Sequence, residues 1–208
     1  GNIHHCQPAA VSITQTSETG SLYSLEEIAA ISGVCKAHGL KLHMDGARFA
    51  NAVAALGVSA AEVTWKAGVD ILSFGATKNG ALAAEAVVVF DKSLSRELAF
   101  RRKRGGHLFS KMRLLATQME AYVTDDLWLK NARQANANAV RMAEGLDGIA
   151  GVEQTQSASA NILFVKMPRA VIDGLKDDGH LFYERGGKNV IRLVLAFDTP
   201  SQDIDAFI

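Results

Sequence analysis

One lysine, Lys78, stands in a short loop over residues 75–80, directly after an apolar stretch that ends at Phe74. A lysine in a partly apolar pocket can lose its proton and attack an aldehyde to form a Schiff base. Ser73 and Thr77 add hydroxyl groups close by in sequence. The loop does not fit a nucleotide-phosphate loop, which ends in Gly-Lys-Ser/Thr, because here the lysine precedes Gly80. Lys78 is thus either a nucleophile or an ordinary lysine of a solvated loop.

A second polar group occupies residues 43–48, at the end of an expected strand. His43 and Asp45 share one face because strand side chains alternate with a period of two, and α/β sheets bind ligands at such strand ends. Gly46 would allow the backbone to approach a flat ring, and Arg48 would reach back with planar donors. The same six residues also fit the start of a helix that is capped by Asp45, with Arg48 on the surface.

The two segments explain each other if the ligand is pyridoxal phosphate. Lys78 would bind the aldehyde carbon of this cofactor, and the Asp45 carboxylate would keep the ring nitrogen protonated, which the ring needs to accept electrons. Lys78 follows Asp45 by 33 residues (78 minus 45). That spacing leaves room for two helices and a strand, so two neighbouring strand ends could bring both side chains to one ring.

The elements that must position these residues alternate between strands and helices, which predicts an α/β fold. The continuous apolar run over residues 86–90 is typical of a strand covered on both faces in a parallel or mixed sheet. Capping boxes at Ser24 and Ser59 predict two helix starts, and Gly39 predicts a left-handed end for the first of these helices. In this half of the chain we expect strands at residues 11–14, 40–45, 69–74 and 86–90, and a helix at 47–56.

Beyond Asp91 the pattern changes to longer helices, for which Asp125 and Asp126 are plausible caps. We expect residues 1–124 to form the C-terminal portion of a large cofactor-binding domain, and residues 125–208 a smaller α+β domain that is truncated at its end. The predicted helices cover residues 96–102, 111–123, 127–146 and 171–176, and the predicted strands cover 161–165 and 190–195.

Composition limits the classes of function. The 208 residues are 48% hydrophobic, which is enough for a substantial core, and 22 basic residues balance 22 acidic ones. The charge signature of a nucleic-acid binder is missing, so a small-molecule ligand is expected. No apolar stretch approaches the roughly 20 residues that span a bilayer, so we expect no membrane partner. Cys6 and Cys35 lack metal-ligand spacing and are too few for a disulfide framework, so we predict no metal and a reducing cytoplasm.

Segments at residues 43–48, 73–80 and 191–194 together resemble the L-threonine aldolase family, and residues 13–24 and 101–106 extend the resemblance over nearly the whole chain. The resemblance implies a fold-type-I enzyme that depends on pyridoxal phosphate. It implies that Lys78 forms the Schiff base, that Asp45 pairs with the ring nitrogen and that Arg48 bonds the phenolic oxygen. Arg192 would bind the substrate carboxylate with its rigid two-pronged fork.

The implied reaction cleaves L-threonine, L-allo-threonine or a related β-hydroxy-α-amino acid to glycine and an aldehyde. His43 is a candidate base that would act through residues in contact with the substrate, without contacting the substrate itself. One alternative is a β-eliminating lyase, which would release pyruvate and ammonia. The resemblance also implies a homodimer or homotetramer, in which the basic residues 101–104 would either serve a partner subunit's phosphate or form a solvated helix end.

A second alternative is a catalytically incomplete fragment. The sequence starts at Gly1 rather than methionine and stops at Ile208 inside an expected helix, so we expect a piece of a longer enzyme. In the resembled family, a phosphate-binding loop and a histidine that stacks on the ring precede the segment with which this chain begins. His4 and His5 lie in the wrong segment to replace them and are expected to be surface or loop residues.

Overall fold

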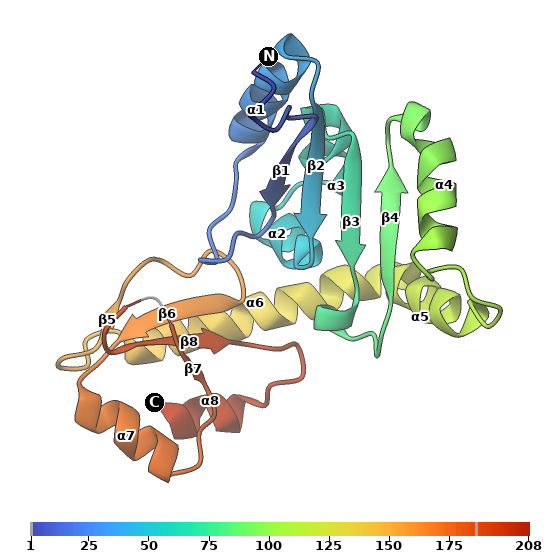
Figure 1. The fold of residues 1–208 in the computed structure, drawn as a ribbon. Helices are drawn as coiled ribbons and strands as arrows, with labels where there is room; N and C mark the ends of the chain where they lie inside the picture. Colours follow the sequence, from blue (N-terminus) through green and yellow to red (C-terminus); the bar gives the residue numbers. More distant parts are fainter. Residues whose placement is uncertain (1, 186) are drawn as a thin grey trace.

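The computed structural model describes residues 2–185 and 187–208, so that Gly1, where the sequence begins, lies outside the described residues. Two separate four-stranded sheets are joined by one long helix, α6 (Leu127–Leu146), as Figure 1 shows. The first sheet carries Lys78 and Asp45 on its strand ends, and the second carries Arg192. The α/β class expected from the alternating elements is confirmed.

The first sheet has the strand order β1-β2-β3-β4. Strands β1, β2 and β3 run parallel, and β4 pairs antiparallel with β3. The carboxyl ends of the three parallel strands point toward α6 and the second sheet (Figure 1). Their bounds are β1 (Ala10–Thr14), β2 (Lys41–Gly46), β3 (Ile71–Gly75) and β4 (Glu85–Val89).

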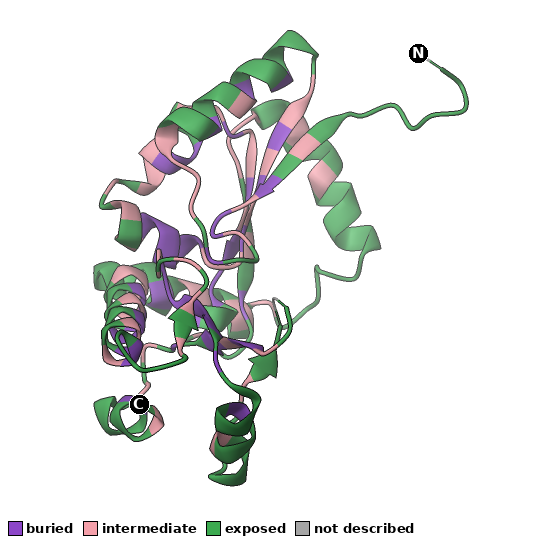
Figure 2. Cartoon of the chain, turned by 90° about the vertical axis from the view of Figure 1, so that its left-hand side faces the viewer, coloured by how far each residue is buried: buried purple, intermediate pink, exposed green. Residues whose placement is uncertain are grey.

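Three helices cover one face of this sheet: α1 (Leu25–Ala37), α2 (Phe49–Leu56) and the single turn α3 (Ala60–Val63). Along β2, Leu42 and Met44 are buried toward the helices, while His43 and Asp45 alternate with them and are only half-buried. Figure 2 shows the buried residues gathered between these helices and the strands. The period-two pattern therefore places the polar residues on one face, as the sequence predicted.

Local signals in the sequence set the helix ends correctly in this half of the chain. Ser24 and Ser59 each accept a hydrogen bond from the backbone N–H of a glutamate three residues later, and both capping boxes are complete. Gly39 has a φ of +66°, the left-handed conformation predicted for the end of α1. Helix α2 begins at Phe49, two residues later than predicted. Residues 47–48 form a turn instead, in which the Ala47 N–H donates a hydrogen bond to the Asp45 side chain.

The prediction that residues 86–90 are covered on both faces is wrong. Strand β4 lies at the edge of the sheet, and its side chains Val87 and Val88 are 52% and 36% exposed. A continuous apolar run indicates a strand but does not show which faces are covered. Trp65 is also 54% exposed, whereas Trp128 stacks on the Phe49 ring with centroids 6.3 Å apart.

Helices α4 (Ser95–Arg104) and α5 (Arg113–Val123) follow β4 and lead into α6. Asp125 and Asp126 precede α6 with positive φ angles of 50° and 54°, and Asp126 makes no side-chain capping hydrogen bond. The capping role predicted for these two aspartates is therefore wrong. The backbone turns sharply here, and the aspartates occupy the turn instead of capping the helix.

The second sheet is antiparallel throughout, with the strand order β5-β6-β8-β7. Its core lies between the sheet and helices α6, α7 and α8, and includes Met142, Leu163, Ile172, Ile191 and Ile204. The remaining bounds are β5 (Glu153–Gln154), β6 (Ile162–Lys166), α7 (Arg169–Asp177), β7 (Tyr183–Glu184), β8 (Val190–Val194) and α8 (Ser201–Phe207).

Helix α6 packs on both units. Asn136 in its middle donates a hydrogen bond of 3.0 Å to the backbone oxygen of Asn51 in α2, and receives one of 3.1 Å from the Asn51 side chain. Its C-terminal half, through Ala139, Met142 and Leu146, belongs to the core of the second sheet. The domain boundary near residue 125 stays a prediction. Within the described ranges, no helix is both long and apolar enough to cross a membrane.

Replacing Gly33 with alanine should raise the free energy of unfolding by about 0.5–1 kcal/mol, because alanine favours helix. Gly33 is an exposed residue of α1 with open space around an added Cβ. The same change at Gly46 should lower the free energy by about 1–3 kcal/mol through overpacking. An added Cβ there would lie 2.7 Å from both the Ser73 carbonyl oxygen and Leu72 Cδ1. Urea unfolding measures both variants, and equal stabilisation by both would contradict the close packing at Gly46.

Candidate functional site

Lys78 lies in a short 3-10 turn, Thr77–Asn79, just beyond the carboxyl end of β3, and its side chain is exposed. The Thr77 hydroxyl closes the connection to β4: it accepts from the Ala84 N–H at 3.1 Å and donates to the Ala84 carbonyl at 3.3 Å. The apolar strand β3 thus ends in a turn that presents the lysine at the end of the sheet.

Asn79, the next residue, is buried, and no sequence pattern around it predicted a functional role. Its Nδ2 donates to the Tyr122 hydroxyl at 2.7 Å and to the Trp128 carbonyl at 2.8 Å. Asn131 of α6 donates to the Asn79 carbonyl at 2.9 Å. Burial raises the pKa of Tyr122 to about 12, so its hydroxyl stays protonated at neutral pH. An asparagine beside the lysine was visible in the sequence, but its partners come from α5 and α6.

His43 spans three strands of the first sheet. Its Nδ1 lies 2.7 Å from Ser12 Oγ in β1, and its Nε2 lies 3.0 Å from Ser73 Oγ in β3. Ser73, predicted to bind cofactor, therefore contacts the imidazole through its hydroxyl. Both ring nitrogens lie within hydrogen-bonding distance of a hydroxyl group, so the ring is held between β1 and β3.

Asp45 is paired in register with Thr14 on one side and Ser73 on the other. Its Oδ1 accepts a hydrogen bond of 3.0 Å from the Ala47 N–H, which shapes the turn after β2. That turn packs directly on the end of β3, since a Cβ added to Gly75 would lie 2.8 Å from Ala47 Cα. Glycine at position 75 thus lets the turn after Asp45 approach the strand that leads to Lys78.

Arg48 follows β2 of the first sheet and Arg192 lies on β8 of the second, within electrostatic range of each other. Both are half-buried, and among the described residues neither buried Nε atom has a hydrogen-bond partner. Burial lowers the pKa of Arg48 below its usual value, the positive charge of Arg192 lowers it further, and Glu18 partly offsets the effect. Unpartnered buried donors of like charge are costly. An anionic group would satisfy both.

Thr16, in the loop after β1, also has a buried side-chain atom, Oγ1, that has no partner in the described part of the chain. Sequence reasoning did not find this residue, because a single threonine in a polar loop carries no distinguishing signal. Two guanidinium groups and a hydroxyl are suitable for binding carboxylate or phosphate oxygens. Together with the lysine and Asp45 at adjacent strand ends, they fit the donor set that an aldehyde cofactor with anionic groups requires.

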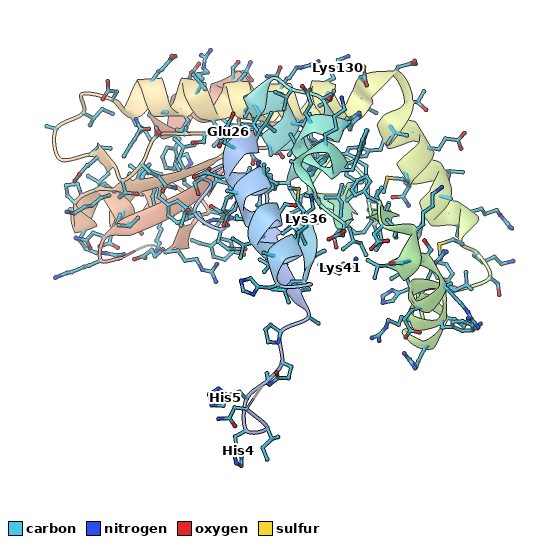
Figure 3. All side chains as sticks on the ribbon, turned by 90° about the horizontal axis from the view of Figure 1, so that it is seen from above. His4, His5, Glu26, Lys36, Lys41 and Lys130 are labelled. Carbon is cyan, nitrogen blue, oxygen red and sulfur yellow. The ribbon has the colours of Figure 1, made fainter. Side chains whose placement is uncertain are left out.

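His4, His5 and the basic stretch at residues 101–104 lie apart from these residues. Figure 3 shows His4 and His5 at the tip of the N-terminal segment, away from the body of the molecule, so their placement as surface residues is confirmed. Residues 101–104 form the exposed end of α4, where Arg101 pairs with Glu97 at 3.0 Å. Cys6 is exposed and Cys35 buried, and both are free thiols.

Comparison with known proteins places this architecture among the fold-type-I enzymes. Threonine aldolase from Leishmania major matches all of this chain and 61% of its own, with a TM-score of 0.90 and 28% identity. A protein from Clostridium difficile 630 with bound pyridoxal phosphate shares the fold over 95% of this chain, with a TM-score of 0.68 and 14% identity. The predicted fold class, an α/β fold of type I with a mixed sheet, is confirmed.

The β-eliminating lyase family model matches residues 1–168, and the chain belongs to this family. The low specificity L-threonine aldolase of Pseudomonas sp. (strain NCIMB 10558) is 42% identical over 198 residues, which make up 95% of this chain and 57% of that protein. The chain therefore spans little more than half the length of that relative. The resemblance to L-threonine aldolases that the motifs indicated is confirmed.

Malonate, compared with chloride at the same ionic strength, should raise the melting temperature by about 3–5 °C when it is in tenfold excess over its dissociation constant. The reason is that a bound carboxylate relieves the repulsion between the two arginines. In Arg192→Gln the shift should fall below about 1 °C, since one of the two cationic groups is lost. Arg141→Gln is the control, because Arg141 pairs with Asp205 on the surface. An unchanged malonate shift in Arg192→Gln would argue against an anion site here.

Proposed function

We propose that this chain is the lysine-bearing part of a pyridoxal-phosphate enzyme that cleaves L-threonine, L-allo-threonine and related β-hydroxy-α-amino acids to glycine and an aldehyde. The observation that carries the proposal is that Arg48 and Arg192 lie within electrostatic range of each other, each with a buried Nε that has no partner among the described residues, while Lys78 directly follows the end of β3. Membership of the β-eliminating lyase family and 42% identity to a low specificity L-threonine aldolase support the choice of reaction.

Three side chains of the chain would hold the cofactor. Lys78 would bind its aldehyde carbon through Nζ, and Arg48 would donate to its phenolic oxygen. Asp45 would hold a proton at the ring nitrogen, because an adjacent carboxylate favours the protonated form. When bound, pyridoxal phosphate supplies an electron sink for the pair released as the Cα–Cβ bond breaks. Ser73 and Thr77 would assist near the phosphate, in addition to the hydrogen bonds that they make within the chain.

Arg192 would bind the substrate carboxylate. Its position on β8, paired with Phe164 of β6, holds the base of the side chain rigidly, while its guanidinium group supplies two parallel donors for the two carboxylate oxygens. Fixing the carboxylate orients the remaining Cα substituents, including the Cα–Cβ bond that is to be cleaved. Thr16 offers a hydroxyl for a further polar group of a bound ligand.

His43 would act on the site through Ser73. The imidazole holds the Ser73 hydroxyl at 3.0 Å, and Ser73 is the register partner of Asp45 on the neighbouring strand. A proton taken up or released by the ring would pass through one of its two serine partners. His43 would therefore assist proton transfer without contacting the substrate itself.

We further propose that the enzyme works in the cytoplasm as a homodimer or homotetramer. The support for assembly is an accumulation of exposed apolar side chains on the elements after β4, among them Phe100, Leu108, Phe109 and Leu114. Exposed apolar area of this kind marks interaction surfaces. The basic end of α4, at residues 101–104, lies in the same region and would face a partner subunit's phosphate group.

β-Elimination is the second candidate function, favoured by the family model that the chain matches. The two reactions use the same lysine and the same acid, and differ in which bond at the substrate breaks. Aldol cleavage releases glycine and an aldehyde, whereas elimination releases pyruvate and ammonia. The 42% identical relative favours the aldol reaction.

Lys78 should form the covalent bond to pyridoxal phosphate. Incubation with the cofactor should give a visible absorption band that borohydride removes, and peptide mass mapping should find the reduced pyridoxyl group on Lys78. Lys78→Ala should lose both signals, whereas Lys66→Ala, which removes another lysine near Trp65, should keep them. A reduced group on a different lysine, or a band that persists in Lys78→Ala, would contradict the assignment.

Asp45→Asn should remove the carboxylate charge and leave the turn after β2 intact. The asparagine side-chain oxygen can still accept from the Ala47 N–H, so the melting temperature should stay close to that of the wild type. Loss of the carboxylate charge should lower kcat by about 10²–10³-fold, the usual cost of removing one preorganised electrostatic group. Glycine and acetaldehyde release from L-threonine measures the rate. Full activity in Asp45→Asn would refute a role for the charge.

A further inference from the structure

The turn that carries Lys78 has few hydrogen bonds of its own. The N–H groups of Asn79 and Ala81 both donate to the Ala76 carbonyl, at 3.0 and 3.2 Å. A 3-10 turn of three residues has poorer hydrogen-bond geometry than an α-helix and little stability in isolation. Its position must therefore be fixed by contacts outside the turn. The Thr77 hydroxyl holds its first residue to Ala84, and the buried Asn79 side chain holds its last residue.

We propose that Asn79 is a positioning residue that holds Lys78 in place for bond formation with an aldehyde. Both amide hydrogens of its Nδ2 are used, one for the Tyr122 hydroxyl of α5 and one for the Trp128 carbonyl at the start of α6. Asn131 of α6 secures the Asn79 carbonyl in addition. Two helices thus determine the position of the residue that follows the lysine. This inference rests on the function proposed for Lys78.

The same helix also holds the segment that follows Arg192. Asn138, two helical turns beyond Asn131, donates from Nδ2 to the carbonyls of Ala196 at 3.0 Å and Thr199 at 3.2 Å, just after β8. The two segments meet directly, because a Cβ added to Gly80 would lie 3.5 Å from the Phe197 ring and 2.7 Å from Asn131 Nδ2. Helix α6 therefore sets the separation between the lysine turn and the strand that carries Arg192.

Asparagine is well suited to this position. Alanine would remove the donor to the Trp128 carbonyl and would leave the Tyr122 hydroxyl only its contact of 3.5 Å with the Gly75 carbonyl. Aspartate would bring an acceptor against the Trp128 carbonyl, where a donor is needed. The consequence for Lys78 would be misplacement of its backbone. A displacement of about 1 Å at a reacting group can cost about 10²-fold in rate.

Asn51 provides a matched control. Like Asn79, it is buried, and it joins α6 to α2 through hydrogen bonds with Asn136. It does not touch the lysine turn in any hydrogen bond of the described residues. Asn79→Ala and Asn51→Ala should therefore both lower the melting temperature, and only the first should affect Lys78.

Two measurements on the full 208-residue chain test the inference. Pyridoxal phosphate titration, followed by its absorbance, should give a dissociation constant about tenfold higher for Asn79→Ala, and within about twofold of wild type for Asn51→Ala. Hydrogen exchange of the amides at positions 79 and 81 should be about tenfold faster in Asn79→Ala only. Tyr122→Phe, which removes one of the two acceptors, should lie between wild type and Asn79→Ala in both measurements.

Equal effects of Asn79→Ala and Asn51→Ala on both readouts would overturn the inference and leave Asn79 with a role in general stability. Unchanged exchange in Asn79→Ala would also overturn it. If the wild-type chain forms no adduct at Lys78, the proposed function fails, and the exchange measurement by itself still decides whether Asn79 fixes the turn. The two failures are therefore distinguishable.

Discussion

The parallel pairing of β2 with β3 is the constraint on which the rest of the molecule depends. It sets Asp45 opposite Ser73 and Gly46 opposite Phe74, so both strands deliver their following turns to the same edge of the sheet. Gly46 and Gly75 make this pairing close enough for the turn after β2 to touch the end of β3, because a side chain at either position would collide with backbone atoms. For this reason Asp45, at the end of β2, and the turn that carries Lys78, after β3, lie at the same edge of the sheet.

A second constraint is electrostatic. Arg48 and Arg192 approach each other with buried Nε atoms that lack partners among the described residues, and their mutual repulsion contributes to the lowered pKa of Arg48. Such an arrangement costs stability, and it persists only because other contacts of the fold hold it in place. Helix α6 does so through amide side chains: Asn131 secures the lysine turn, Asn136 secures α2, and Asn138 secures the chain after β8. Hydrogen bonds that link the two sheets are thus concentrated in one helix, and the anion site that we propose would lie between the two arginines.

Much of this arrangement followed from local sequence patterns. The capping boxes at Ser24 and Ser59, the left-handed Gly39 and the alternation along β2 were all predicted, because each depends on residues only a few positions apart. Predictions that depended on distant neighbours did less well. The apolar run of β4 indicated a strand but not an edge strand, and the aspartates before α6 turned the backbone instead of capping the helix. Burial depends on what packs against a segment, and its own residues do not specify that.

The sequence by itself determined that Lys78 follows an apolar strand, that Asp45 ends another and that both belong to an α/β fold, since hydrophobic period and turn residues encode these features locally. Only the tertiary structure decided that Arg48 meets Arg192, which lies 144 residues further along the chain (192 minus 48). It also decided that His43 is held by Ser12 and Ser73, and that Asn79 bonds to Tyr122 and Trp128. The physical reason is that the partners in each of these contacts lie 30 or more residues apart in sequence, and only the packing of strands and helices brings them within hydrogen-bonding or electrostatic range.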